Sequence, residues 1–292
     1  MKNKLIKTFA LGLVIMLSSC TDVVQIKLDE GSKLYVIDAF VNNTFDTQKI
    51  RVVTNDTYFS NREAPAVTNA QVLLKDLTDN KNYSFSYSDN GYYIYQVKNL
   101  GEISKINHQY ELNVTIDGVT YTSLTTQKRP AGIDSIQSIY DDGTSGFGGS
   151  QPYWNCLLWA KDRVDNVTDY YWIKTFKNDT LQDKNQLNLC IDGTGGPVSG
   201  LEVDYVYFTP PATFLGFDRF KLNDKINVEV HSITRDTYFF FVQAQAQISN
   251  GGLFATTPEN VKTNIVSPKD AKTKAIGWFN MASVASKEKV IQ

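Results

Sequence analysis

Few residues of this chain belong to types and spacings that could do catalytic or metal chemistry. The two histidines, His108 and His231, stand beside predicted strands and lack the paired His, Cys or Asp spacing of a zinc site. Serines are plentiful, but none lies in a Gly-x-Ser-x-Gly elbow. A carboxylate pair for glycoside hydrolysis can come from distant positions, so an exported glycan-active enzyme stays as a minor alternative. We therefore expect a protein that is not an enzyme, with no catalytic residues, no metal and no cofactor.

Two loops contain residues that could bind small ligands. Asp162, Asp165 and Asp169 could supply oxygen ligands for calcium, although a solvated turn explains them equally well. The stretch 141–150 contains four glycines, but the Lys-Ser/Thr and the strand-loop-helix context of a phosphate-binding loop are missing. We interpret the two stretches as an ordinary turn and a glycine-rich loop.

Cys20 is the residue whose surroundings indicate a specific reaction. Three early lysines and a short apolar run at 9–17 have the layout of a secretory signal, and the run is too short to span a membrane. The run ends in Leu-Ser-Ser-Cys at 17–20, which resembles the lipobox of bacterial lipoproteins, whose Cys is acylated and becomes the first mature residue. The sequence thus predicts a signal peptide over 1–19 and a lipidated Cys20 followed by a polar tether over 20–33. An ordinary secreted protein with an incidental Cys is the alternative.

The other two cysteines, Cys156 and Cys190, form an even pair in an exported chain. A disulfide between them would close a loop of roughly 35 residues and stabilise the fold by about 3–4 kcal/mol on the chain-entropy estimate. Two separate buried thiols are the alternative, because free Cys packs as a small hydrophobe. The sequence leaves both open.

The first half of the chain shows the period-two alternation of strands in a sheet with one buried face. Asp117-Gly118 is the signal of a two-residue type I′ hairpin, and Asn90-Gly91 marks another turn. Seven short strands in this length favour a two-sheet sandwich of immunoglobulin-like or transthyretin-like type over 34–128. The predicted strands are 34–41, 48–54, 69–76, 82–87, 92–97, 108–116 and 119–126.

A polar stretch broken by Pro130 and Gly132 marks a domain boundary. We expect a separate, strand-rich C-terminal domain over 131–292, so that the whole protein is mainly β. Its predicted strands are 133–140, 153–161, 170–177, 201–208, 225–230, 275–280 and 281–284.

One segment of the second half, 234–249, has helical rather than strand periodicity. Thr234 can cap its start, and an Asn-Gly-Gly sequence after it can end it. Aromatic residues surround its first turns, so we expect that half to be buried, with Phe241 deepest. The glutamines of the later turns should reach solvent.

An aromatic stretch at 205–220 surrounds the pair Pro210-Pro211, which cannot lie inside a central strand. Aromatic side chains on a loop suit a partner surface. The alternative is that they fold back and cover a sheet of their own domain. The candidate partner residues are Tyr205, Tyr207, Phe208, Phe214 and Phe217.

The charge balance argues against one class of partner. The formal net charge is −2 at pH 7 and no basic block is visible, so we expect no binding to nucleic acid. No second apolar run approaches the ~18 residues that a membrane span needs. The lipid on Cys20 is thus the expected attachment to a membrane.

Several pieces of the sequence together resemble one family. They are LSSC at 17–20, KLYVIDAFV at 33–41, AQVLLKD at 70–76, NGYY at 90–93, IDSI at 133–136, and a C-terminal run of DKINVEVHSITRDTYFFF, NGGLFATTPENVKTNI and AIGWF. The ordered set is similar to the lipoproteins grouped as domain of unknown function 4249, over nearly the whole mature chain. That family occurs in Gram-negative bacteria and is frequently encoded beside a TonB-dependent outer-membrane receptor.

The resemblance implies an outer-membrane lipoprotein, facing either the periplasm or the outside, that serves as a non-catalytic binding or accessory protein in receptor-dependent uptake. A TonB-dependent receptor is then the expected protein partner. The family has no established activity, so it brings no catalytic residues. A cell-surface structural, adhesion or glycan-binding protein is the alternative, because it needs the same anchor and sandwich but no receptor.

Overall fold

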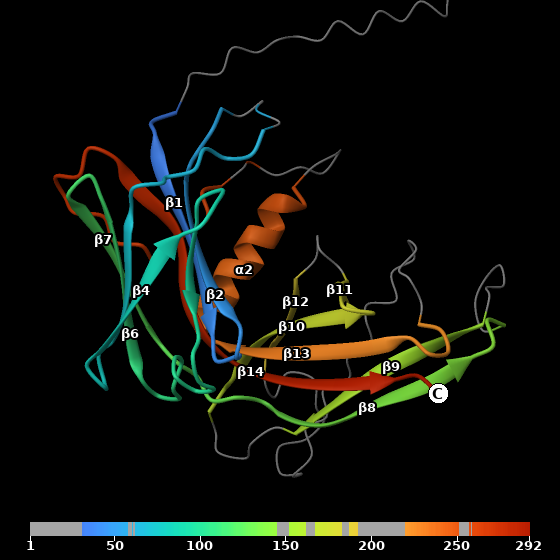
Figure 1. The fold of residues 1–292 in the computed structure, drawn as a ribbon. Coiled ribbons are helices and arrows are strands. Elements are labelled where there is room, and N and C mark those ends of the chain that lie inside the picture. Colours follow the sequence, from blue (N-terminus) through green and yellow to red (C-terminus); the bar gives the residue numbers. More distant parts are fainter. Residues whose placement is uncertain are drawn as a thin grey trace, which may run out of the picture. The chain divides into compact units, whose positions relative to one another are not determined.

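The computed structural model describes residues 31–57, 60, 62–144, 152–161, 167–182, 187–191, 220–250, 257 and 259–292. The chain divides into two units, Met1–Ser32 and Lys33–Gln292, and the second contains all described strands (Figure 1). The predicted signal peptide, Cys20, the strand expected at 201–208 and the five candidate partner residues between 205 and 217 lie outside the described residues.

All seven strands predicted for the first half are present. They are β1 (Leu34–Asn42), β2 (Thr47–Thr54), β3 (Gln71–Asp76), β4 (Lys81–Tyr87), β5 (Tyr92–Gln96), β6 (Gln109–Ile116) and β7 (Val119–Thr126). They follow one another in the order β1-β2-β5-β4-β3-β6-β7. Alternate residues are buried, as in β6, because successive side chains of a strand point to opposite faces. Asp117 and Gly118 have φ of 49° and 80°, which confirms the type I′ turn between β6 and β7.

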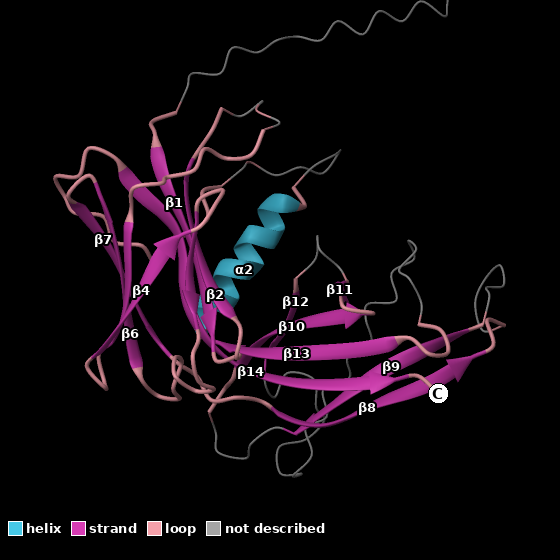
Figure 2. Cartoon of the chain, in the orientation of Figure 1, coloured by secondary structure: helices cyan, strands magenta, loops and turns pink. Residues whose placement is uncertain are grey.

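The second half is also built of strands, which confirms the mainly β fold class (Figure 2). β8 (Gly132–Asp141) and β9 (Tyr153–Lys161) form a two-stranded sheet. The strands β10 (Tyr170–Lys177), β11 (Thr180–Leu181), β12 (Asn188–Ile191), β13 (Lys225–Ile233) and β14 (Lys274–Val290) belong to the 12-stranded sheet that also contains β1–β7. A second core packs between the two sheets. It contains Ile136, Cys156, Leu158, Ile173, Phe220, Ile226, Val228, Val230 and Ile291.

A single strand, β14, joins the two halves. The sequence predicted two closing strands at 275–280 and 281–284, but β14 is continuous over 17 residues. Its first part, Lys274–Ala282, pairs in parallel with β1, and its second part, from Ser283, pairs antiparallel with β13. The sheet thus crosses the boundary that the sequence predicted at 128–131, because β1 needs a partner from the end of the chain.

The core of the first half also depends on β14. Phe279 and Met281, both 0% exposed, belong to the same buried cluster as residues of β1–β7. A chain cut at Lys128 would lose these side chains and leave one edge of β1 unpaired. Lys33–Gln292 therefore forms one compact unit, whereas the sequence predicted two domains within it.

Side chains satisfy the backbone of β14 where it changes partner. Asn43 Oδ1 accepts the Val284 N–H at 2.7 Å, and Ser104 Oγ donates to the Ala282 carbonyl at 3.2 Å. Ser283 Oγ accepts from Gln127 Nε2 and donates to the Lys128 carbonyl, both at 2.6 Å. Buried backbone groups need such partners when a ladder is interrupted.

The helix α2 (Arg235–Ile248) lies against β1, β10 and β14, and it is the one helix within the described residues (Figure 2). Thr234 caps it by accepting the Thr237 N–H at 3.1 Å, as predicted. Phe241 is 6% exposed and stacks on Phe40 of β1 with ring centroids 5.2 Å apart. Phe240 stacks on Trp278 of β14 at 4.4 Å. No helix among the described residues is long and apolar enough to cross a bilayer.

The later turns of α2 differ from the prediction. Three glutamine side chains accept backbone N–H groups from neighbouring segments instead of simply facing water. Gln243 accepts from Lys262 at 2.9 Å. Gln247 accepts from Glu259 and Gln245 accepts from Leu187, both at 3.0 Å. These segments are remote in sequence, so periodicity within the helix could not reveal the bonds.

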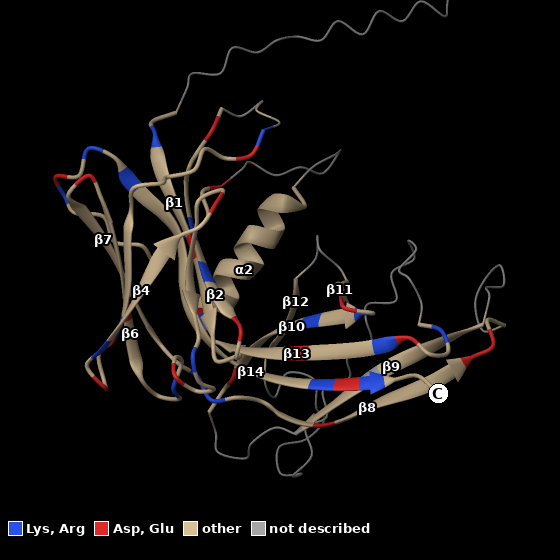
Figure 3. Ribbon diagram, viewed as in Figure 1, with Lys and Arg blue, Asp and Glu red and all other residues tan. Residues whose placement is uncertain are grey.

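The first turns are not buried on every side, because Phe239 is 47% exposed. The charged residues of α2, Arg235 and Asp236, both belong to its first turn. The later turns contain no charged residue and are tan in Figure 3.

We expect the parallel pairing of β1 and β14 to tolerate no side chain at Gly277. A Cβ there would lie 2.0 Å from the Ile37 carbonyl oxygen, and φ is +120°. Gly277→Ala should cost at least about 3 kcal/mol of unfolding free energy, because the two strands must move apart. Gly101→Ala is the matched control, since φ is +74° but no atom lies within 4 Å of the added Cβ. It should cost about 1 kcal/mol. Equal urea midpoints would contradict this account.

The contrast between two neighbouring phenylalanines tests how α2 packs. Phe241 is 6% exposed between Phe40 and Trp172, whereas Phe239 is 47% exposed. Phe241→Ala should lower the free energy of unfolding by about 3–5 kcal/mol. Phe239→Ala should lower it by less than about 1 kcal/mol. Denaturant melts of the two variants provide the measurement, and a Phe239→Ala loss as large as the Phe241→Ala loss would refute the assignment.

Candidate functional site

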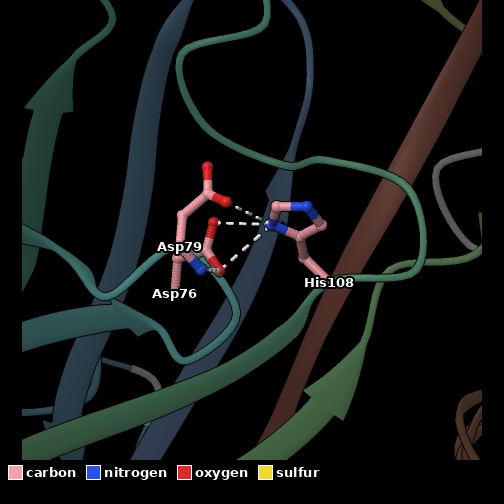
Figure 4. A group of neighbouring side chains, drawn as sticks. All are labelled: Asp76, Asp79 and His108. Atoms are coloured by element: carbon pink, nitrogen blue, oxygen red, sulfur yellow. Dashed lines mark hydrogen bonds and ion pairs between the residues drawn. The ribbon is translucent and has the colours of Figure 1, made fainter.

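One group of potential metal- or proton-binding side chains stands out within the described residues (Figure 4). Asp76 ends β3, Asp79 lies in the following turn, and His108 directly precedes β6. Because β3 and β6 pair, with Asp76 opposite Tyr110, the imidazole comes beside both carboxylates. His108 Nδ1 lies 2.9 and 3.1 Å from the two carboxylate oxygens of Asp76 and 4.0 Å from Asp79 Oδ1.

Asp76 holds the turn and the imidazole together. Its side chain is 0% exposed, and Oδ1 accepts the N–H groups of Thr78 and Asp79 at 3.0 Å each. Asp79 forms an ion pair with the Lys105 ammonium, which lowers the pKa of Asp79 and raises the pKa of Lys105. Three ligand atoms lie within 4.8 Å of one another, yet a cation would have to compete with Lys105. The geometry therefore fits a hydrogen-bonded anchor for the turn.

Sequence reasoning missed this cluster. It treated His108 alone, and Asp76 lies 32 positions away. The sequence predicted one strand that ends at Asp76 and another that begins at His108. Pairing these two strands would have brought the two residues together.

A pocket of about 520 Å³ opens beside the cluster and shares Lys105 with it. Its walls come from Lys81–Tyr83 of β4, from Tyr95 near the end of β5, and from the loop Asn99–Glu102. Aromatic rings and polar side chains thus meet in one cavity of a size that suits a small ligand.

The other histidine belongs to a separate polar cluster on β10 and β13. Cross-strand pairing sets Trp172 opposite His231 and Lys174 opposite Glu229. His231 Nε2 lies 2.9 Å from Glu229 Oε2, and Lys174 Nζ lies 4.1 Å from the Trp172 ring centroid. Burial lowers the pKa of His231 more than the nearby carboxylate raises it. The hydrogen bond from His231 is in turn the main cause of the lowered pKa of Glu229.

The cysteines and Asp169 have defined surroundings. No disulfide joins Cys156 and Cys190, and both side chains pack in the same hydrophobic cluster, Cys156 buried and Cys190 half-buried. Burial raises the pKa of Cys156 to about 12, so this thiol is unreactive at neutral pH. Asp169 forms an ion pair with Arg129, at 2.5 Å from its Nη2 atom, which occupies one candidate calcium ligand. Asp162 and Asp165 lie outside the described residues.

The buried His231 predicts a defined pH dependence of stability. Its pKa in the folded protein lies below 6.5, the ordinary value, so as the pH falls through 6.5 the unfolded chain takes up a proton first. The free energy of unfolding should therefore decrease from pH 6.5 down to the folded-state pKa. Protonation of Glu229 decreases the free energy of unfolding further only below pH 4.5, because the pKa of Glu229 is lowered in the folded protein. His231→Gln should flatten the decrease between these values in urea melts, and an unchanged slope would exclude His231 as its source.

Comparisons with known proteins identify a family and give weak structural likenesses. A family model described as "Domain of unknown function (DUF4249)" matches residues 21–288. No curated protein matches the chain. Among solved structures, the FN1–FN3 domains of chicken CNTN1 align at a TM-score of 0.25 and 9% identity, over 70% of this chain and 60% of that one.

A 1.5-MDa bacterial ice-binding adhesin aligns at a TM-score of 0.18 and 13% identity, over 91% of this chain and 66% of that one. The chain thus spans less than two thirds of either structure, and such low scores support no argument about function. The family match covers most of the sequence and begins directly after Cys20. The chain belongs to the DUF4249 family, a family of unknown function.

Proposed function

We propose that this protein is a lipid-anchored lipoprotein of the outer membrane that acts as a non-catalytic binding or accessory protein beside a TonB-dependent receptor. The observation that carries the proposal is the Leu-Ser-Ser-Cys sequence at 17–20 behind a short apolar run. The family match, which starts at residue 21, supports Cys20 as the first residue of the mature chain.

The course of the chain within the folded unit suits an anchored binding protein. β1 begins at Leu34, so residues 21–33 can act as a tether that reaches at most about 45 Å when extended. Tyr35 pairs with Thr54 at one end of β2, whereas Tyr95 of the pocket pairs with Gln48 near the other end. Tyr35, near the start of β1, and Tyr95 of the pocket therefore lie toward opposite ends of β2.

The state of the titratable groups supports a non-catalytic role. The carboxylate of Asp76 bonds His108, and that of Glu229 bonds His231. Neither pair has a described serine or cysteine within hydrogen-bond distance to act as a nucleophile. Both imidazoles thus serve as hydrogen-bonding partners within the fold.

The anchor is tested by Cys20→Ala. The lipid is the expected attachment and contributes about 0.8 kcal/mol per buried CH₂, so the variant should leave the membrane fraction while its thermal unfolding stays unchanged. Cys156→Ala, which removes a thiol from the described core, is the matched control and should remain in the membrane. A Cys20→Ala protein that stays in the pellet after a mild detergent wash would contradict attachment by lipid alone.

The receptor is tested by affinity purification of the tagged lipoprotein from detergent-solubilised outer membranes. A TonB-dependent receptor should copurify in a fixed ratio. Recovery of the lipoprotein alone, under conditions that preserve known receptor complexes, would favour the structural or adhesion alternative.

A further inference from the structure

The pocket between β4, β5 and the loop Asn99–Glu102 has pre-formed aromatic walls. The Tyr95 hydroxyl donates to Glu102 Oε1 at 2.6 Å, and the Tyr83 hydroxyl donates to the Glu102 carbonyl at 2.7 Å. The two rings pack edge to face with centroids 5.5 Å apart, and Phe85 supports Tyr95 at 5.7 Å. Because each hydroxyl already has a partner, both rings are held before any ligand arrives.

The loop that closes the pocket is also fixed by hydrogen bonds. Glu102 Oε2 accepts the N–H groups of Lys98 at 2.6 Å and Asn99 at 3.2 Å. Ile103 is 1% exposed in the core, and the Lys105 N–H donates to the Tyr110 hydroxyl at 2.7 Å. The pocket therefore requires little ordering on binding.

The charges of the pocket are balanced within the protein. Lys105 forms an ion pair with Asp79, and Lys81 Nζ lies 3.9 Å from the same carboxylate. Glu102 is the second carboxylate, and its bond with Tyr95 is the main cause of its lowered pKa. Burial is the main cause that raises the pKa of Tyr95 to about 12, so its phenol stays neutral. Both ammonium groups thus lie beside the Asp79 carboxylate, and an anionic ligand would compete with Asp79 for both lysines.

The rim offers polar groups that a ligand can use. Asn82 and Asn99 line the pocket and are exposed, and their side-chain amides make no hydrogen bond to any residue that the structure describes. Each amide carries a donor and an acceptor side by side, which matches a pair of neighbouring hydroxyl groups. An apolar ligand would leave these amides without partners.

We propose that this pocket binds a neutral saccharide, with one sugar ring against Tyr95 and its hydroxyl groups on Asn82 and Asn99. The ring supplies apolar C–H surface for the aromatic wall, and the hydroxyl groups satisfy the amides without adding charge. This inference rests on the proposed binding role, but it depends neither on the lipid anchor nor on the receptor.

Saturation-transfer NMR on the mature lipoprotein in detergent micelles tests the ligand class. The probes are the methyl glycosides of glucose, galactose and mannose, with methyl glucuronide and methyl glucosaminide as charged comparators. At least one neutral glycoside should show saturation, and it should bind more tightly than either charged comparator. Preference for a charged comparator, or no saturation of any neutral glycoside, would overturn the proposal.

Variants then locate the binding. Asn99→Ala should lower the affinity for the best-binding glycoside about three- to tenfold, as expected for the loss of one hydrogen bond. Tyr95→Ala should abolish the signal, whereas Tyr95→Phe, which keeps the ring, should retain it. Tyr87→Ala is the matched control, because this tyrosine is 41% exposed outside the pocket. Affinity unchanged in Asn99→Ala and in an Asn82→Ala variant would exclude this pocket even if Tyr95→Ala failed to fold.

The same preparation separates this inference from the proposed function. Receptor copurification without sugar binding would overturn the saccharide pocket alone. Sugar binding by a protein that copurifies with no receptor would support the pocket and count against the accessory role.

Discussion

The structure depends on one non-local interaction, the parallel pairing of the first strand with the last. β14 closes the edge of β1 and contributes to the first hydrophobic core, and it then continues as the partner of β13, whose side chains belong to the second core. Gly277 permits this pairing, because the Ile37 carbonyl occupies the space that a side chain would need. Polar side chains then satisfy the backbone at the point where β14 changes partner. The fold is therefore continuous through the polar stretch at Pro130.

The same pairing positions the helix. Trp278 of β14 stacks on Phe240 and donates its indole N–H to Thr237, while Phe40 of the adjacent β1 stacks on Phe241. α2 thus rests on the two strands that are furthest apart in the sequence. Its glutamines in turn hold the segments at 187 and 259–262. One helix links parts of the chain that no local pattern connects.

The polar groups divide into those that support the fold and those that remain available. Asp76, His108, Glu229 and His231 are used within the protein, because a buried charge or imidazole is costly without a partner. The amides of Asn82 and Asn99 instead face an open pocket with fixed walls. The groups available to a ligand are therefore the tyrosines and asparagines of this pocket and not the histidines.

Local patterns in the sequence predicted β1–β10, β13 and the helix, but they missed β11 and β12 and divided β14 into two strands. Period-two alternation predicted β1–β7, and the Asp117-Gly118 sequence predicted the hairpin between β6 and β7. Thr234 predicted the start of the helix. The pairing of β14 with β1, the meeting of Asp76 with His108, and the pocket around Tyr95 were decided only by the tertiary structure. Each of these contacts joins segments that are far apart in the sequence, and short-range periodicity does not specify which segments pair. They meet because folding buries the apolar faces of the sheets.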